Sequence, residues 1–540
     1  MKKINWKKVT PHLIAIGVFL IVALVYCKPA LQGKVLQQSD VIHWRGMAEN
    51  SMKYKETHGN YPLWTNGMFS GMPAYQIAMD PKNPFNIIYL HKVFSLFLGK
   101  PFMFFFLLCV GFYFLSQVFG VDYRIGILGA LAYAYASFSS ILIVAGHETQ
   151  IQAMAYMPAL LGAILLVYKK RYLIGATSTA VFTDLLVAMN HLQVTYYLLI
   201  VATFMTIYYL IEWIRAKDYK HIIKSFAIIA ITGLIGIASN LVILATTYDY
   251  SKATMRNGVL NLDSSKANAS SETGLPIDYA FQWSFEKPEV FSILVPNVYG
   301  GVSGVDELGK NSHLAKLAIA QGASEDDAVN FAKQTADQLG RMYWGSQPFT
   351  SGPVYFGAII CFLFLFGMIY LKRTDKWWLL AACVVAIMMS WGRNFPAFND
   401  FLFYHLPLYN KFRVPTYTLI IPELLFPLLS VITLNQVFFV ETDKAFLWKK
   451  LKLTGLVMLG VFLILLMMYS SFDYKGAEAG QIENVINQQQ DKNQSTAIQS
   501  AYNALKADRQ SLFGADIIRS LIFIALAFVC LWAYLKNKLK

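Results

Sequence analysis

Charged residues are scarce in this chain of 540 residues, in which Asp, Glu, Lys and Arg together make up only 14% of the sequence. A soluble globular protein carries about 25% charged residues, so the deficit argues against a soluble enzyme. A disordered chain is excluded for the opposite reason, because 56% of the residues are hydrophobic and 15% are aromatic. The composition indicates a polytopic membrane protein.

Cysteine is also rare, and its pattern excludes two further classes. The five cysteines all lie in apolar runs, and none belongs to a CxxC pair or to a Cys/His metal-binding spacing, so neither a disulfide framework nor a zinc site is expected. The chain has no GxxxxGK[ST] or GxGxxG in a suitable strand–helix context, which excludes a nucleotide-driven pump. The cysteines are Cys27, Cys109, Cys361, Cys383 and Cys530.

Long apolar runs are abundant. A helix needs about 20 apolar residues to cross a bilayer, and twelve runs approach that length. They predict an all-α polytopic membrane protein of about 12 transmembrane helices with large outer loops. The runs are 11–29, 101–119, 124–143, 152–168, 173–190, 192–211, 225–246, 353–371, 377–391, 415–439, 453–470 and 516–535.

The net charge of +14 indicates the orientation. Lys and Arg gather in alternate short connections, whereas the two connections around His147 and His191 on the other side contain neither. By the positive-inside rule both termini are cytoplasmic. The basic charge is therefore a topology signal, and no nucleic-acid partner is expected.

All the large loops then lie on the outer side, which makes this the active face. The chain divides into residues 1–246 with the first seven helices, 247–352 as an outer helical subdomain, and 353–540 with the last five helices. Within 247–352, Ser324 followed by acids at 325–327 predicts a helix start. The outer loops are 30–100, 247–352, 392–414 and 471–515, and the last is expected to form a helical hairpin.

Two acids stand close to the membrane in these loops. Asp40 follows the first apolar run by about ten residues, and Glu148 stands beside His147 in the second outer loop. Burying a carboxylate at the membrane surface without a partner costs free energy, so its presence there suggests a site that faces a lipid-linked substrate. The structural alternatives are a helix cap before residues 47–55 for Asp40, and a solvated loop acid for Glu148.

Three further polar residues lie in or beside apolar runs. Asp184 and His191 are seven positions apart and so share nearly one helix face, and Glu423 lies at a similar depth in a later run. Each either makes a structural hydrogen bond or faces a polar cavity. A proton relay through the three would be typical of a secondary transporter.

Arginine and tryptophan in the outer loops suggest phosphate and sugar binding. Arg393 and Arg413 run against the positive-inside trend, and a guanidinium suits phosphate recognition. Trp44, Trp64 and Trp283 are candidates for stacking on sugar rings, although interfacial aromatic belts look similar. His147 and His191 complete the set of candidate substrate-binding residues.

The outer loops also carry five motifs in order. They are an acid at Asp40; Pro62-Leu63-Trp64 followed by Phe69-Ser70-Gly71-Met72-Pro73; Gly146-His147-Glu148; Lys287-Pro288-Glu289 followed by Leu294-Val295-Pro296-Asn297-Val298-Tyr299-Gly300-Gly301; and Phe412-Arg413-Val414-Pro415. Over most of residues 1–440 this order resembles the bacterial YfhO family of membrane proteins. That family belongs to the GT-C superfamily of polyprenyl-phosphate-sugar glycosyltransferases, and its chains usually run longer.

The resemblance implies roles for these residues. Asp40 takes the place of the first-loop carboxylate that acts as base or positions the acceptor, and Glu148 takes the place of the second-loop acid. Arg413 and Arg393 would stabilise the departing lipid phosphate. The loops contain no Asp-x-Asp-like pair, so a tightly bound metal is not expected. If a metal takes part, it is Mg²⁺ or Mn²⁺ with Asp40, His147 and Glu148 as candidate ligands.

The implied reaction is inverting transfer of a sugar from a polyprenyl-phosphate carrier to an extracytoplasmic glycan, teichoic-type polymer or lipid. It would take place at the outer face of the bacterial cytoplasmic membrane. The rival hypotheses are a secondary transporter or lipid flippase, and a non-catalytic scaffold of envelope assembly. The large 247–352 loop and the lack of a repeat between the two halves count against transport.

Overall fold

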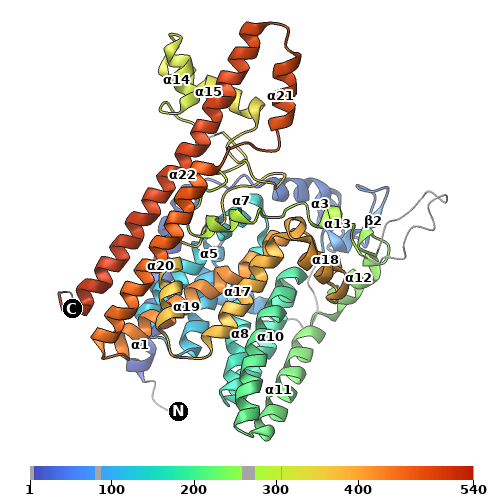
Figure 1. The fold of residues 1–540 in the computed structure, drawn as a ribbon. Helices are drawn as coiled ribbons and strands as arrows, with labels where there is room; N and C mark the ends of the chain where they lie inside the picture. The colour runs from blue at the N-terminus through green and yellow to red at the C-terminus, as the bar shows by residue number, and fades with distance from the viewer. Residues whose placement is uncertain (1–4, 80–86, 258–273, 306, 539–540) are drawn as a thin grey trace.

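The structure, a computed structural model, describes residues 5–79, 87–257, 274–305 and 307–538. It is built almost entirely of helices (Figure 1). The strands of the described residues are β1 (Trp64–Thr65) and β2 (Met72–Pro73), which pair antiparallel in the first outer loop. The expected all-α class is confirmed.

Seven helices of the described residues are long and apolar enough to cross a membrane, and a bent pair, α6 (Tyr123–Ala134) with α7 (Ser137–Ala145), makes an eighth if it counts as one span. The chain is therefore a multi-pass membrane protein, whereas the count of twelve spans stays a prediction. The long helices are α1 (Trp6–Tyr26), α8 (Glu148–Tyr168), α10 (Leu192–Arg215), α11 (Tyr219–Ala238), α19 (Ile420–Phe439), α20 (Lys444–Ser471) and α22 (Lys492–Leu535). Four shorter apolar helices coincide with predicted runs: α5 (Phe102–Val118), α9 (Tyr172–Ala188), α16 (Ala358–Tyr370) and α17 (Lys376–Ser390).

Two predicted runs are not continuous helices. The run at 124–143 bends by 43° between α6 and α7, and the run at 353–371 becomes helical only at Ala358. The two interruptions lie side by side, because the Ser137 hydroxyl donates to the Pro353 carbonyl at 2.6 Å and accepts from the Tyr355 amide at 2.7 Å. Backbone groups freed by a helix break in an apolar bundle need such partners. Each interruption therefore supplies hydrogen bonds to the other.

Further helices connect the bundle at its loop-bearing end. α3 lies across that end (Figure 1). These helices are α2 (Lys28–Leu31), α3 (Ser39–His58), α4 (Tyr89–Phe94), α12 (Leu241–Ser251), α13 (Ile277–Ala280) and α18 (Pro396–His405). The 3-10 turns are η1 (Ala74–Gln76), η2 (Met255–Asn257), η4 (Pro288–Ile293), η5 (Gly392–Asn394), η6 (Tyr409–Lys411) and η7 (Pro415–Leu419).

A small subdomain, termed the outer subdomain after the predicted orientation, stands on top of the bundle (Figure 1). It is made of α14 (His313–Ala320), α15 (Glu325–Leu339), α21 (Ala479–Gln488) and the first turns of α22. It has its own apolar core. The predicted helix start is confirmed, since the Ser324 side chain caps α15. The expectation that 247–352 forms one subdomain is corrected, because Leu275, Phe285 and Trp344 join the core of the membrane bundle instead.

The bundle has two distinct ends. α1 begins and α22 finishes at the end away from the outer subdomain (Figure 1). The predicted outer loops gather at the opposite, loop-bearing end. Which end faces the cytoplasm stays a prediction from the charge pattern.

Candidate functional site

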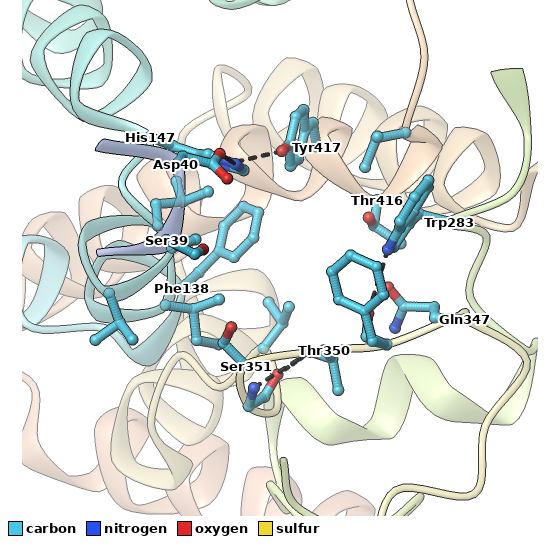
Figure 2. A pocket seen from close by; sticks show the side chains of 18 of the residues that line it. Ser39, Asp40, Phe138, His147, Trp283, Gln347, Thr350, Ser351, Thr416 and Tyr417 are labelled. Carbon is cyan, nitrogen blue, oxygen red and sulfur yellow. Dashed lines mark hydrogen bonds and ion pairs between the residues drawn. The ribbon is translucent and has the colours of Figure 1, made fainter. Parts of the chain in front are cut away.

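A cavity of about 760 Å³ opens at the loop-bearing end, within the range of roughly 300–1,000 Å³ typical of small-molecule sites. One wall consists of the start of α3, of α7 and of His147, and the other of Trp283 and residues 347–354 and 413–417. Figure 2 shows the two walls facing each other. The cavity brings together four predicted site residues from distant parts of the chain: Asp40, His147, Trp283 and Arg413.

Asp40 is held at the cavity by close docking of α3 on α7. The helix begins at Ser39, so Asp40 lies in its first turn, and the expectation of a cap before residues 47–55 is wrong. The Gln38 side chain donates to a carbonyl of α7 at 2.5 Å. Gly146, which ends α7, has φ +97°, and a Cβ there would lie only 3.1 Å from the Cβ of Asp40. Glycine thus permits both the left-handed turn and the close approach.

Asp40, His147 and Tyr417 form a chain of hydrogen bonds. His147 Nε2 lies 3.0 Å from Asp40 Oδ2, and the Tyr417 hydroxyl lies 3.0 Å from His147 Nδ1 (Figure 2). A carboxylate only accepts hydrogen bonds, so Nε2 carries the proton and Nδ1 of the neutral ring accepts from Tyr417. Tyr417 is not among the predicted site residues, because a tyrosine at the start of an apolar run gives no sign of a functional role.

The surroundings of His147 favour this neutral ring. Burial lowers the pKa of His147 below its ordinary value, and Arg413 adds to the decrease, whereas Asp40 opposes it. The net direction is downward, so the imidazole is neutral at pH 7. Burial, with the nearby His147, also lowers the pKa of His191 to about 4.

Arg413 stands on the opposite wall between two aromatic rings. Its guanidinium donates to the Tyr279 hydroxyl at 2.6 Å and lies 5.5 Å and 6.0 Å from the ring centres of Tyr279 and Trp283. Within the described ranges no carboxylate pairs with it. The next residue, Val414, has φ +64°, a strained conformation for a β-branched side chain of the kind found at ligand sites.

Two more cations, Arg256 and Lys411, lie near Arg413 without lining the cavity, and Arg256 is not among the predicted site residues. The Arg256 guanidinium donates to the Lys411 carbonyl, and the Lys411 ammonium donates to the Arg256 carbonyl at 2.6 Å. Partial desolvation and the nearby Arg413 lower the pKa of Arg256. The three cations, termed the cation cluster below, retain unused N–H donors. Arg256 could have been found by the rule that singled out Arg413, namely arginine at the outer face.

A buried acid braces the wall that contains Gln347. Glu289 Oε1 accepts from Gln347 Nε2 at 3.0 Å and from the Tyr343 hydroxyl at 2.9 Å, and its other oxygen accepts from the Glu286 amide. Burial raises the pKa of Glu289 to about 7. Because Gln347 also lines the cavity, Glu289 supports the wall without facing the cavity.

Two predicted site residues lie close to the cavity without lining it. Glu148 forms an ion pair with Lys100. His191 is largely buried near His147, and within the part of the chain that the structure describes its Nδ1 has no hydrogen-bond partner.

The other three predicted residues make hydrogen bonds outside the cavity. Arg393 donates to the Ser346 carbonyl at 2.6 Å. Trp44 donates from its indole to the Ile77 carbonyl at 2.9 Å, and Trp64 donates to Asn66 within its own hairpin. These contacts do not bring the three side chains to the cavity lining.

The placement of Glu148 leads to a first prediction. Since Glu148 is paired with Lys100 and does not line the cavity, we expect E148Q to keep transfer activity within about threefold of wild type. The assay is sugar transfer by purified protein, with K100Q as the matched control. A loss of a hundredfold in E148Q alone would restore Glu148 to the catalytic group.

The intramembrane acids have different surroundings. Asp184 is satisfied, since it accepts from Asn240 Nδ2 at 2.6 Å, from the Ser239 hydroxyl and from the Ile87 amide, which gives it a structural role. Glu423 is fully buried and accepts from Ser139 at 3.2 Å, while its second oxygen has no partner among the described residues. Asp184 and Glu423 thus have different hydrogen-bond partners, and no hydrogen bond among the described residues links them.

The candidate metal ligands do not fit Mg²⁺ or Mn²⁺. Hard cations prefer several free oxygen ligands, but Glu148 is paired with Lys100, and His147 donates its Nε2 proton to Asp40. Among the described residues no group of three His, Cys, Asp or Glu side chains is arranged to hold a metal ion.

The fold and the cavity define a multi-pass α-helical membrane protein with a largely apolar cavity at its loop-bearing end, into which a few polar and charged side chains project. Comparisons with protein-family models, with curated proteins and with solved structures give no match.

Proposed function

We propose that this protein is a membrane glycosyltransferase that moves a sugar from a polyprenyl-phosphate carrier to an acceptor outside the cell. The observation that carries the proposal is the cavity itself, in which a carboxylate–imidazole pair faces an arginine flanked by aromatic rings. These are the groups that glycosyl transfer from a phosphate needs: a base on one side and a cation for the leaving group on the other.

The reaction assigns a role to each wall. The acceptor hydroxyl loses its proton to Asp40 while its oxygen forms a bond to the anomeric carbon of the sugar. The bond from that carbon to the phosphate oxygen breaks, and its electron pair stays on the phosphate, next to Arg413. Attack from the side opposite the leaving group inverts the anomeric centre. Trp283, which lines the cavity beside Arg413, offers a ring face for the sugar.

The cation cluster supports a lipid-phosphate donor. Arg256 and Lys411 are fixed by mutual hydrogen bonds to each other's backbone, so little ordering entropy is lost when an anion binds. The departing phosphate gains a second negative charge, and three nearby cations stabilise that charge more in the transition state than in the bound donor.

The proposed setting follows from the charge pattern. We place the protein in the bacterial cytoplasmic membrane, with both termini cytoplasmic and the cavity outward. The acceptor is then an extracytoplasmic glycan, teichoic-type polymer or lipid, and the membrane lipids surround the apolar helices.

The deciding experiment is donor turnover by purified protein in lipid nanodiscs. The probe is a set of radiolabelled undecaprenyl-phosphate hexoses, with membranes of the producing cell as the source of acceptor, each assayed with and without EDTA. We expect release of undecaprenyl phosphate and label in an acceptor product. Movement of lipid-linked sugar across the bilayer without cleavage would favour the flippase alternative, and neither activity would favour the scaffold.

A second prediction separates the cations. We expect R413Q to lower the rate of transfer by about 10²–10³-fold, the effect of losing one preorganised charge-stabilising donor. For R256Q we expect mainly a higher KM for the donor, by about threefold to tenfold, because Arg256 lies near Arg413 but does not line the cavity. R45Q, which removes an exposed arginine of α3, is the matched control. Equal small effects in all three variants would refute a phosphate site here.

A further inference from the structure

Asp40 needs support to act as a base. Its side chain is 54% exposed and lies in the first turn of α3, where an aspartate on its own would populate several rotamers. Among the described residues its hydrogen-bonding partner is His147. The orientation of the carboxylate therefore depends on how the imidazole is held.

The imidazole is itself held by Tyr417. The donated hydrogen bond to Nδ1 selects the tautomer with hydrogen on Nε2, which is the one that can donate to Asp40. The two rings also pack edge to face, with centres 6.0 Å apart. Because Tyr417 lies four residues after Arg413, one short segment contributes both the cation for the phosphate and the support for the base.

We infer that His147 and Tyr417 are positioning residues that orient Asp40 for proton transfer. This inference rests on the proposed glycosyltransferase function. In the reaction the acceptor proton moves to the free oxygen of Asp40. The Nε2 proton stays on His147 and holds the other carboxylate oxygen. No proton leaves the imidazole, so His147 and Tyr417 act by orienting the Asp40 carboxylate and by their effect on its charge.

The charged and titratable groups around His147 determine its pH response. They are Asp40 on α3, Arg413 and Tyr417 on the opposite wall, His191 between α9 and α10, and the adjacent Glu148, which is paired with Lys100. As the pH falls through the lowered pKa of His147, the ring becomes cationic and makes Asp40 a weaker base. Transfer activity should therefore fall on the acid side, at a pH below the ordinary histidine value of about 6.5.

The kinetic test compares three variants, and it is the third prediction. We expect Y417F to lower kcat about tenfold, as for loss of one hydrogen bond, with the donor KM changed less than about twofold and the acid limb moved to higher pH. H147A should lose more activity than Y417F. H147Q, whose amide retains a donor for Asp40, should recover activity relative to H147A and lose the His147-dependent acid limb. Unchanged kcat and pH profile in Y417F would overturn the inference.

A second readout needs no turnover. Diethyl pyrocarbonate modifies neutral imidazole, so the pH dependence of His147 modification, measured by mass spectrometry, reports its protonation. We expect the midpoint to lie below about 6.5 in wild type, to rise in Y417F, which loses the donor to Nδ1, and to fall in D40N. Midpoints that do not move in these directions would overturn the inferred role of His147 and Tyr417. If the midpoints of the variants shift as expected but wild type transfers no sugar, the proposed function fails, whereas the hydrogen-bonded chain of Asp40, His147 and Tyr417 is still supported.

Discussion

Replacing Asp40 with asparagine is expected to lower the rate of sugar transfer by about 10²–10⁴-fold while the protein still folds. That range is what a general base typically contributes. Asparagine has nearly the shape of aspartate and still offers an oxygen to His147 Nε2, so the docking of α3 on α7 should survive. The measurement is donor turnover in nanodiscs, with the elution profile on size exclusion as the check on folding.

The control lies on the same helix. Glu49 is another acid of α3, with a side chain 59% exposed and paired with Lys53, and it does not line the cavity. E49Q should therefore transfer sugar at the wild-type rate. If D40N does the same, Asp40 is not the base, and the site must be reconsidered from Arg413 outward.

Replacing Arg509 with methionine is expected to destabilise the outer subdomain by about 3–5 kcal/mol, the usual consequence of breaking a buried ion pair. Arg509 is fully buried, and its guanidinium donates to the carbonyls of Gly340, Arg341 and Tyr474 and to Glu478 at 2.9 Å. Methionine fills a similar volume but satisfies none of these acceptors. The segment after α15 and the segment before α21 would both lose the hydrogen bonds from Arg509 that hold them together.

Hydrogen exchange measures this effect locally. We expect faster exchange in α14, α15 and α21 of R509M, with the membrane helices unchanged. K506M is the matched control on the same helix, since Lys506 makes one contact over the Tyr502 ring worth about 0.5–1 kcal/mol. The double variant R509M/E478Q should recover part of the loss, because it no longer leaves Glu478 without its partner. Wild-type exchange in R509M would contradict the assigned role.

The sequence predicted the ingredients of the site better than their pairing. Residue type and position relative to the apolar runs were enough to select Asp40, His147 and Arg413, because charge at a membrane mouth is rare for a physical reason. Their mutual contacts depend on how α3 docks over α7, which no local pattern reports. Tyr417 escaped notice because a tyrosine at the edge of an apolar run is typical of a membrane interface.

The fold was predictable to a similar depth. Hydropathy indicated the helices but not the break between α6 and α7, since Ser137 is compatible with a continuous helix and the break depends on the distant Tyr355. The division of 247–352 between two cores was equally hidden, because the second core needs residues of α21 and α22. Both errors arise from contacts between segments far apart in the chain.

The continuity of α22 has a geometric consequence. The helix runs for 44 residues, from Arg509 in the outer subdomain past Asp516 and Ser520, which bind Asn297 and the Leu294 carbonyl in the bundle. Because the helix is continuous, each residue added between Arg509 and Asp516 would rotate the subdomain by about 100° about the helix axis and move it about 1.5 Å away from the bundle. The direction in which the subdomain faces relative to the bundle is thus set by the number of residues between these two contacts.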